Sequence, residues 1–241
     1  MHPLLPIAHR GYSARFPENT LAAFAAAYDF GVLAVETDVR LSSDGVPVCL
    51  HDASLERLAR SEKSVARTPL SDIRQTLCDA GRDLCLLEEA LALAVERKGR
   101  LLLDVKAPDA LPKIHALLVS MSVPEDAVTL GLRCTPQVKE WRKMDARRPI
   151  LGFLAHTKEI PDFYAAGGTL VRFWEEDLTA DPRLVRLAEG RPFWVMAGAR
   201  EQGCGDITLP RIACLRQLGA SAVLLNDPSL IGPCRNGGVA A

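Results

Sequence analysis

Two carboxylates, two histidines and an arginine lie close together near the start of the chain. Glu36 and Asp38 follow the apolar run 32–35, and side chains two residues apart in a β-strand point to the same face. Like charges held this close repel each other unless a cation lies between them. A bound cation can also neutralise the charge of a phosphate group. The spacing therefore predicts a metal-assisted site suited to phosphodiester cleavage.

Each of the two histidines stands at the end of an apolar run. His9 follows residues 4–8 and His51 follows residues 46–50, so both are expected at carboxyl ends of strands, where parallel α/β proteins place their chemistry. Imidazole titrates near neutral pH and can accept or donate a proton. The guanidinium of Arg10 can bind two phosphate oxygens at once. A structural ion pair with a strand-end carboxylate is the alternative for Arg10.

Several short motifs follow one another in this region: His9-Arg10-Gly11, Pro17-Glu18-Asn19-Thr20, Glu36-x-Asp38, Asp44-Gly45 and His51-Asp52. In order and spacing they resemble the glycerophosphodiester phosphodiesterases, a family of (β/α)8 barrels, most closely over residues 7–60. The resemblance implies metal-dependent hydrolysis of glycerophosphodiesters to an alcohol and glycerol 3-phosphate. It also implies that His9 and His51 divide the roles of catalytic acid and base, and it does not assign which histidine has which role.

The resemblance extends to the segment Leu101-Leu102-Leu103-Asp104-Val105-Lys106, which is similar to the family's strand with the third metal ligand. It implies a divalent ion held by Glu36, Asp38 and Asp104, although the family usually has glutamate where this chain has Asp104. Oxygen ligands without thiolates favour Mg²⁺ or Ca²⁺ over zinc. Lys106 shares the strand face of Asp104 and is interpreted as a phosphate contact, with a salt bridge as the alternative.

Two tryptophans near the ends of later strands are candidates for the pocket of the substrate alcohol. Residues 219–228 resemble the family's last strand, and residues 193–197 retain Trp194 of the family's usual Trp-Thr-Val-Asn run. We expect Trp194 to bind substrate, with aromatic core packing as the alternative for both Trp174 and Trp194. Asn226 closes the last strand and can orient another residue of the mouth; we assign it no catalytic role.

Short apolar runs alternate with segments of helical period along the chain, which predicts an α/β fold: a single (β/α)8 TIM barrel over residues 1–241. The predicted strands are 4–9, 32–38, 101–106, 127–131, 149–155, 169–173, 192–197 and 221–226, with an added strand at 46–51. The predicted helices are 20–30, 87–98, 109–121, 135–144, 181–189 and 208–218. The Pro17-Glu18-Asn19-Thr20 motif is interpreted as a turn and helix cap, with Gly31 ending that helix. Residues 232–241 are expected to form a flexible tail.

Composition narrows the function classes. The 29 basic and 30 acidic residues leave a net charge of −1, so nothing indicates nucleic acid or an anionic membrane as an obligate partner. No apolar run reaches about 18 residues, and the N-terminus lacks the pattern of a signal peptide, which predicts a soluble, cytoplasmic protein. The seven cysteines are scattered without a C-x2-C pair, so neither disulfides nor a zinc site is expected.

The leading hypothesis is a hydrolase of lipid and glycerol metabolism whose partner is a small-molecule glycerophosphodiester. One alternative keeps the site and changes the substrate to a lipid, as in a lysophospholipase D-like or cyclising phosphodiesterase. The other is a catalytically silent binding module on a barrel. A silent module would be expected to lose a histidine or a metal ligand, and His9, His51, Glu36 and Asp38 are all present. The head group, the choice between Mg²⁺ and Ca²⁺, and the formation of a homo-oligomer stay open.

Overall fold

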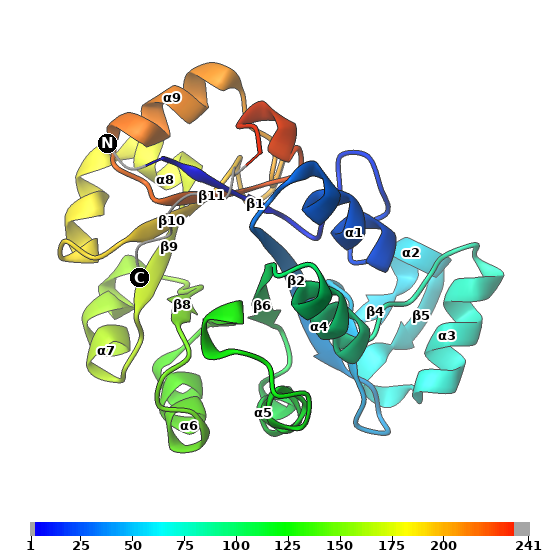
Figure 1. The fold of residues 1–241 in the computed structure, drawn as a ribbon. Helices are drawn as coiled ribbons and strands as arrows, with labels where there is room; N and C mark the ends of the chain where they lie inside the picture. The colour runs from blue at the N-terminus through cyan, green and yellow to red at the C-terminus, as the bar shows by residue number, and fades with distance from the viewer. Residues whose placement is uncertain (1–2, 234–241) are drawn as a thin grey trace.

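The structure is a computed structural model that describes residues 3–233. Eight parallel strands form a closed barrel with helices around it (Figure 1). Each strand pairs with the next one along the chain, and β1 closes the barrel by pairing with both β11 and β2. The barrel strands are β1 Leu5–Ala8, β2 Ala34–Leu41, β6 Arg100–Val105, β7 Val128–Leu132, β8 Ile150–Gly152, β9 Leu170–Trp174, β10 Phe193–Met196 and β11 Ala222–Leu225. The predicted TIM barrel is confirmed.

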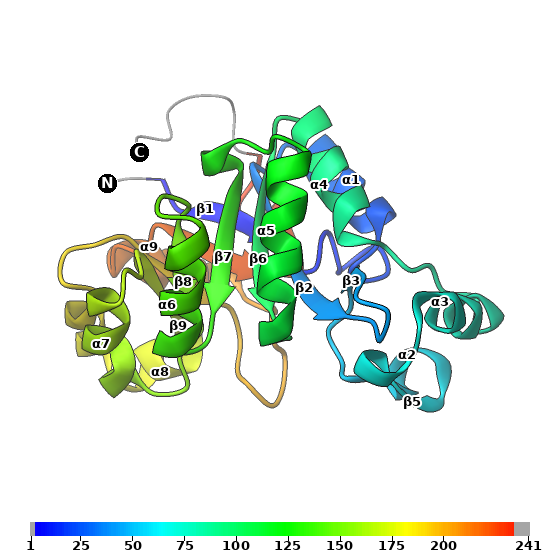
Figure 2. The ribbon, with the colours of Figure 1, turned by 90° about the horizontal axis from the view of Figure 1, so that it is seen from below.

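The helices lie outside the barrel: most of them pack against it, whereas α2 and α3 lie to one side of it, as the view from below shows (Figure 2). They are α1 Leu21–Phe30, α2 Glu56–Ala59, α3 Leu70–Asp79, α4 Leu87–Glu96, α5 Leu111–Ser120, α6 Thr135–Met144, α7 Ile160–Ala165, α8 Glu175–Ala180 and α9 Leu209–Gln217. The predicted caps of α1 are both present. The Thr20 side chain accepts a hydrogen bond from the Ala23 amide, and Gly31 ends the helix at φ 95°, a left-handed conformation that suits glycine.

A small lobe is inserted between β2 and α4, seen beside the barrel at α2 and α3 (Figure 1). It contains β3 Pro47–Cys49, which runs antiparallel to β2, and a two-stranded sheet of β4 Ser54–Leu55 and β5 Ser61–Ser64. Its own buried core comprises Val48, Leu50, Leu55, Val65, Ile73 and Leu77. The sequence predicted only the added strand of this lobe. Helix α2 and strands β4 and β5 are too short to show a clear period, whereas the ten-residue helix α3 was missed although its buried Ile73 and Leu77 are four residues apart.

The later part of the chain differs from the prediction in detail. The helix expected at 181–189 is a 3-10 helix, Pro182–Ala188, and α7 and α8 were not predicted. Helix α8 begins with the acidic residues Glu175, Glu176 and Asp177, which favour a helix N-terminus through the helix dipole. Of the expected tail, residues 234–241 lie outside the described part of the chain.

Side chains alternate between two cores along each barrel strand. Residues that point outward pack against the helices. Those that point inward form an apolar cluster inside the barrel that comprises Ile7, Leu102, Leu151, Phe153, Met196, Ala222 and Leu224. At the carboxyl ends of the strands the inward positions become polar, which places the charged residues of the motifs at the barrel mouth. Among the described residues, no helix combines the length and the apolar character needed to cross a membrane.

Candidate active site

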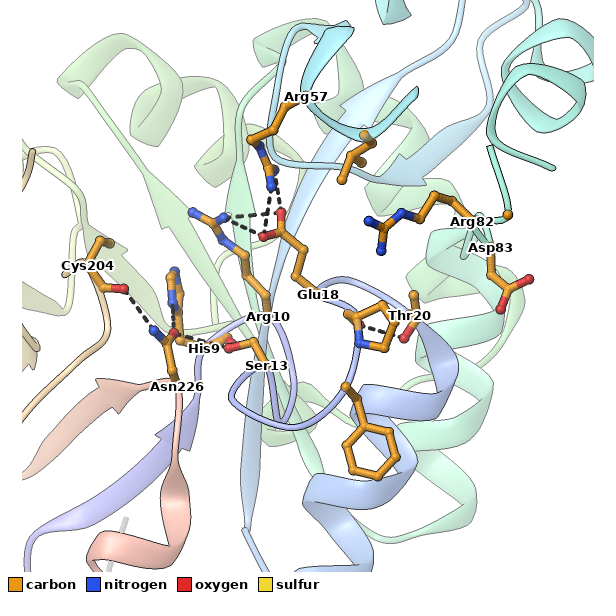
Figure 3. A pocket seen from close by; sticks show the side chains of 14 residues that line it. His9, Arg10, Ser13, Glu18, Thr20, Arg57, Arg82, Asp83, Cys204 and Asn226 are labelled. Atoms are coloured by element: carbon orange, nitrogen blue, oxygen red, sulfur yellow. Dashed lines mark hydrogen bonds and ion pairs between the residues drawn. The ribbon is translucent and has the colours of Figure 1, made fainter. Parts of the chain in front are cut away.

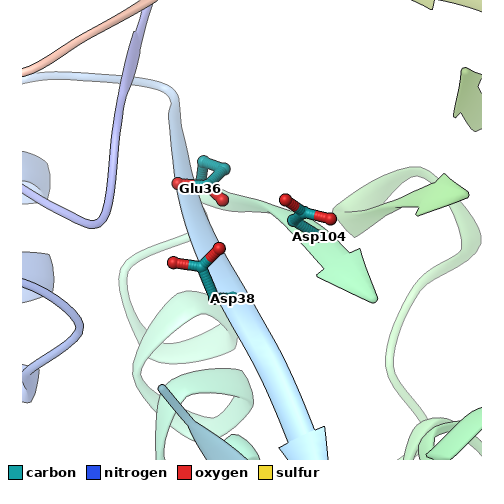
Figure 4. A group of neighbouring side chains, drawn as sticks. All are labelled: Glu36, Asp38 and Asp104. Carbon is teal, nitrogen blue, oxygen red and sulfur yellow. The ribbon is translucent and has the colours of Figure 1, made fainter. Parts of the chain in front are cut away.

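The three predicted metal ligands converge at the carboxyl ends of β2 and β6 (Figure 4). Glu36, Asp38 and Asp104 are only 2%, 1% and 4% exposed, and each offers an oxygen within 4.8 Å of the others. Asp38 and Asp104 stand side by side in the parallel register of the two strands. Three buried oxygen ligands at this separation suit a hard divalent cation.

The electrostatics of this carboxylate cluster show that the positive charge around it compensates its carboxylates unevenly. Burial, together with the charges of Asp38 and Asp104, raises the pKa of Glu36 well above its ordinary value. Burial also opposes ionisation of Asp38, but Lys106 and Arg10 outweigh it and hold the pKa of Asp38 well below its usual range. Lys106 and Arg10 therefore neutralise Asp38 better than they neutralise Glu36. A divalent cation would remove the remaining repulsion, so the residues present fit a metal ion.

Lys106 lies between two of the carboxylates. Its Nζ is 3.0 Å from Asp38 Oδ1 and 2.6 Å from Asp104 Oδ2. The salt bridge considered as the alternative role of Lys106 is thus present. Arg133, directly after β7, donates from Nη2 to Asp104 Oδ1 at 2.6 Å and to Oδ2 at 2.7 Å. The sequence analysis did not identify Arg133, whose one signal is its position at a strand end.

Asn19 holds one of the metal ligands in place. Its Nδ2 donates to Asp38 Oδ2 at 2.9 Å, while its Oδ1 accepts from Thr37 Oγ1 at 2.8 Å and from the Asp38 amide at 3.2 Å. Asn19 has φ 55°, a left-handed conformation that asparagine tolerates. The motif interpreted as a turn and helix cap therefore also orients Asp38.

Arg10 contacts three carboxylates at the mouth, of which Figure 3 shows Glu18. Its backbone N–H donates to Glu36 Oε2 at 2.9 Å, its Nη1 lies 3.2 Å from both oxygens of Glu18, and its Nε lies 3.3 Å from Asp38 Oδ2. The structural ion pairs considered for Arg10 are present. The next residue, Gly11, has φ 83°, and a Cβ there would lie 2.6 Å from the Ala23 side chain, so the tight turn that presents Arg10 requires glycine.

His9 is buried at the end of β1, and its hydrogen bonds define its tautomer. Asn226 Nδ2 donates to the Cys204 carbonyl at 3.0 Å and to Asp206 Oδ1 at 2.9 Å, so Asn226 Oδ1 must be the atom 2.8 Å from His9 Nδ1. His9 therefore donates from Nδ1 and keeps a free lone pair on Nε2, 4.0 Å from Glu36 Oε2. Burial and, to a lesser extent, Arg10 lower the pKa of His9 to about 4. Near neutral pH this imidazole is neutral and can accept a proton.

His51 has a more open environment than His9. Its side chain is 35% exposed, and its Nδ1 lies 2.7 Å from Asp52 Oδ1. Arg57 Nε donates to the other oxygen of Asp52 at 2.5 Å, and Arg57 also pairs with Glu18. This chain of charged groups fixes the ring through Nδ1 and leaves Nε2 available for proton transfer.

A cavity of about 430 Å³ opens beside His9 and Arg10. The labelled side chains in Figure 3 come from the loop after β1, from the inserted lobe and from the ends of the last strands. The residues that line it are His9, Arg10, Ser13, Phe16, Pro17, Glu18, Thr20, Arg57, Leu58, Gly81, Arg82, Asp83, Cys204 and Asn226. Most of these side chains are polar or charged, which suits a small polar ligand better than an acyl chain.

Trp194, for which a substrate contact is expected, lies inside the barrel. Trp194 is the second residue of β10, opposite the first residue of β11, Ala222, and it packs against the apolar cluster inside the barrel. It does not line the cavity beside His9. Trp174 is the last residue of β9 and is therefore the tryptophan placed toward the mouth. The presence of Trp194 indicated a strand at this position. It did not indicate how far from the barrel mouth the side chain lies, because the register of the barrel strands sets that distance.

Comparisons with known proteins relate this chain to one family. A sequence model described as the glycerophosphoryl diester phosphodiesterase family matches residues 9–148. A glycerophosphodiester phosphodiesterase of Caldanaerobacter subterraneus is 43% identical over 77 residues, which cover 32% of this chain and 31% of the relative. The chain spans less than half of the length of the curated relatives it matches.

Solved structures share the fold over nearly the whole chain. The glycerophosphodiester phosphodiesterase of Thermotoga maritima matches with a TM-score of 0.77 at 20% identity and covers 95% of this chain and 97% of its own. A phosphodiesterase of Oleispira antarctica, solved in complex with the product sn-glycerol-3-phosphate, matches with a TM-score of 0.78 at 21% identity over 94% of both chains. At these identities the structural similarity establishes the barrel fold.

Proposed function

Since this chain belongs to the glycerophosphoryl diester phosphodiesterase family, we propose that it hydrolyses glycerophosphodiesters to an alcohol and glycerol 3-phosphate with the help of a divalent metal ion. The observation that carries this proposal is the convergence of Glu36, Asp38 and Asp104 beside His9. The product found in the Oleispira antarctica relative supports the assignment of glycerol 3-phosphate as one product. The polar lining of the cavity favours a small substrate over the lipid alternative.

Glu36, Asp38 and Asp104 would hold the metal ion. When bound, Mg²⁺ or Ca²⁺ supplies positive charge that offsets the charge of the phosphodiester and polarises its oxygens. Asn19 keeps Asp38 oriented for this role through its hydrogen bond at 2.9 Å. The shorter side chain of Asp104, which replaces the family's usual glutamate, is held in place by Arg133 and Lys106.

The two histidines would move protons on either side of the phosphate. His9 Nε2, with its free lone pair, acts as the base that takes a proton from the attacking water molecule, whose oxygen forms the new bond to phosphorus as the bond to the alcohol breaks. His51 Nε2 delivers a proton to the leaving alkoxide, because His51 is fixed through Asp52 and lies near solvent, from which it can be reprotonated. Arg10 and Lys106 bind the phosphate oxygens by turning part of their hydrogen-bonding capacity from the carboxylates to the substrate.

Purified protein incubated with glycerophosphoglycerol, glycerophosphocholine and glycerophosphoethanolamine tests the proposal. We expect release of glycerol 3-phosphate that stops after chelation and returns with Mg²⁺ or Ca²⁺. Binding of the metal ions is measured in parallel by calorimetry, so that metal affinity and activity are separate readouts. Full activity in excess chelator after exhaustive dialysis would contradict the metal requirement. Metal binding without turnover of any diester would instead indicate the silent binding module.

A further inference from the structure

Arg172 lies inside the barrel on β9, across the barrel from β2, the strand that carries Glu36 and Asp38. It is the middle residue of β9, flanked by the inward-facing Leu170 and Trp174, so its own side chain also points into the barrel. Its guanidinium carbon lies 4.9 Å from the centre of the Phe153 ring and 4.5 Å from that of Trp174. Nothing in the proposed hydrolysis uses this residue.

The guanidinium of Arg172 has unused hydrogen-bonding capacity. Its Nε and Nη1 are buried, and within residues 3–233 they have no hydrogen-bond partner. Burial lowers the pKa of Arg172 to about 10, so the side chain stays charged at neutral pH. A buried charged donor without a partner is costly, and a bound anion would satisfy it.

The neighbouring arginines differ from Arg172 because they are already paired. Arg133 is held by Asp104, and Arg200 is held by Glu176 and Asp177. Their charges are therefore largely neutralised by fixed carboxylates, whereas the described part of the chain provides no salt bridge to Arg172. Among these three arginines, Arg172 has the greatest capacity for an incoming anion.

The aromatic rings around Arg172 are poorly suited to a cationic head group. A choline ammonium binds well to the face of a tryptophan, but the guanidinium of Arg172 lies 4.5 Å and that of Arg200 5.1 Å from the centre of the Trp174 ring. An incoming ammonium would meet two like charges at this ring. An oxyanion would instead meet unpartnered donors.

Building on the proposed hydrolysis, we propose that Arg172 determines specificity by binding an oxyanion, a carboxylate or a second phosphate, on the alcohol part of the substrate. The preferred substrate is then a glycerophosphodiester whose alcohol carries this additional negative charge. Diesters of choline or ethanolamine are poor substrates.

A matched set of diesters tests this inference. Glycerophosphoglycerol is the neutral reference, glycerophosphoglycerate replaces its terminal CH₂OH by a carboxylate, glycerophosphoglycerol phosphate adds a phosphate, and glycerophosphocholine carries a cation. In the wild-type protein we expect kcat/KM for at least one anionic diester to exceed that for the neutral diester by roughly tenfold to a hundredfold, as charge-assisted hydrogen bonds allow. Whichever anionic diester has the higher kcat/KM shows whether Arg172 binds a carboxylate or a phosphate.

Variants of Arg172 separate its charge from its packing. Arg172→Met keeps a long side chain between the rings and should abolish the anionic preference, chiefly through KM, while kcat/KM for glycerophosphoglycerol changes by less than about threefold. Arg172→Lys keeps the charge without the planar fork and should retain part of the preference. Arg191→Met is the matched control, because Arg191 also stacks on an aromatic ring, that of Tyr164, but lies before β10 at the opposite end of the barrel.

The ratio of rates on two diesters is measured on the same preparation, so partial misfolding of a variant cancels. An equal loss on all diesters in Arg172→Met, or wild-type turnover of glycerophosphocholine as fast as that of both anionic diesters, overturns the inference. If no diester is hydrolysed, the proposed function fails and calorimetric binding of glycerophosphoglycerate decides: weaker binding to Arg172→Met than to Arg191→Met sustains the inference, and equal binding overturns it.

Discussion

On one side of the barrel, β1, β2 and β6 bring charged side chains into contact, whereas β8 and β9 on the other side bring aromatic rings around one guanidinium. Asp38 contacts Asn19, Arg10 and Lys106, so its charge is shared among several partners. Arg172 contacts two rings and lacks an ion pair within residues 3–233. In the proposed function the first side acts on the phosphate, and the second side binds a charged group on the alcohol that the phosphate carries.

This difference suggests a division of tasks in one mouth. Groups that stabilise developing charge must be held rigidly, and the ion pairs and hydrogen bonds of the first side do this. Groups that select among substrates gain from being unpaired until the substrate arrives, because only the correct substrate then supplies the missing partner.

Loss of either histidine should have the largest effect on the charged side. We expect His9→Ala and His51→Ala each to lower kcat by roughly 10²-fold to 10⁴-fold, the usual worth of a positioned acid or base. A nitrophenyl phosphodiester needs little acid catalysis, so it should restore the rate of His51→Ala and leave His9→Ala impaired. Rescue of the His9 variant instead would reverse the assigned roles. Near-wild-type kcat in both variants would remove proton transfer from these residues.

The burial of His9 should appear in the pH dependence of stability. The pKa of His9 is about 4 in the folded protein and about 6.5 when unfolded, so unfolding takes up a proton between these values. Stability therefore falls as pH decreases through this window, by up to about 3 kcal/mol at pH 4. Denaturant unfolding in excess chelator should show a smaller loss between pH 7 and pH 4 in His9→Gln than in the wild type. Identical pH profiles of the two proteins would show that His9 is not buried in its neutral form.

Removal of Asn19 tests how far the charged side depends on its supporting hydrogen bonds. Asn19→Ala frees Asp38 from its amide partner, and we expect metal affinity to fall by roughly tenfold to a hundredfold. Calorimetric titration with Mg²⁺ and Ca²⁺ measures this change. Thr20→Ala, which removes only the cap of α1, is the matched control, and it should lower the unfolding free energy by about 1 kcal/mol without affecting metal affinity. Equal metal affinity in the two variants would leave Asn19 as a turn residue only.

Substitutions of the two tryptophans should have the smallest effects on activity. They show which of the two side chains contributes to the choice between anionic and neutral diesters. Trp194→Phe should lower the unfolding free energy by about 1–3 kcal/mol, because it leaves a cavity in the barrel interior, while kcat/KM changes by less than about twofold. Trp174→Phe should change the ratio of kcat/KM values between anionic and neutral diesters. A substrate-dependent effect of Trp194→Phe would restore the substrate contact that its position argues against.

Much of the barrel could be predicted from the sequence because each strand and helix is encoded locally. The eight apolar runs match the eight barrel strands, and Thr20 and Gly31 mark the ends of α1 as expected. Helices α2, α7 and α8 and the short strands β4 and β5 were missed because short elements carry too few residues to show a period. Their positions depend on packing against the lobe and barrel cores rather than on local pattern.

The sequence by itself determined which residues are the candidates for the chemistry. The spacing of Glu36 and Asp38, and the strand-end positions of His9 and His51, follow from a period of two residues that holds in any β-strand. Family membership is visible in the same residues, because the matching segment begins at His9.

Only the tertiary structure decided which partners these residues have and how deep each side chain lies. Asn226 follows His9 by more than 200 positions, yet their hydrogen bond fixes the proton on Nδ1. Closure of the barrel creates this pair, because β1 and β11 become neighbours only when the sheet closes. Strand register likewise places Trp194 against the apolar cluster inside the barrel and Arg172 beside Phe153 and Trp174. No local pattern encodes the contact of His9 with Asn226, since it joins strands that are distant in sequence, or the depth of Trp194, since the register is set by the whole barrel.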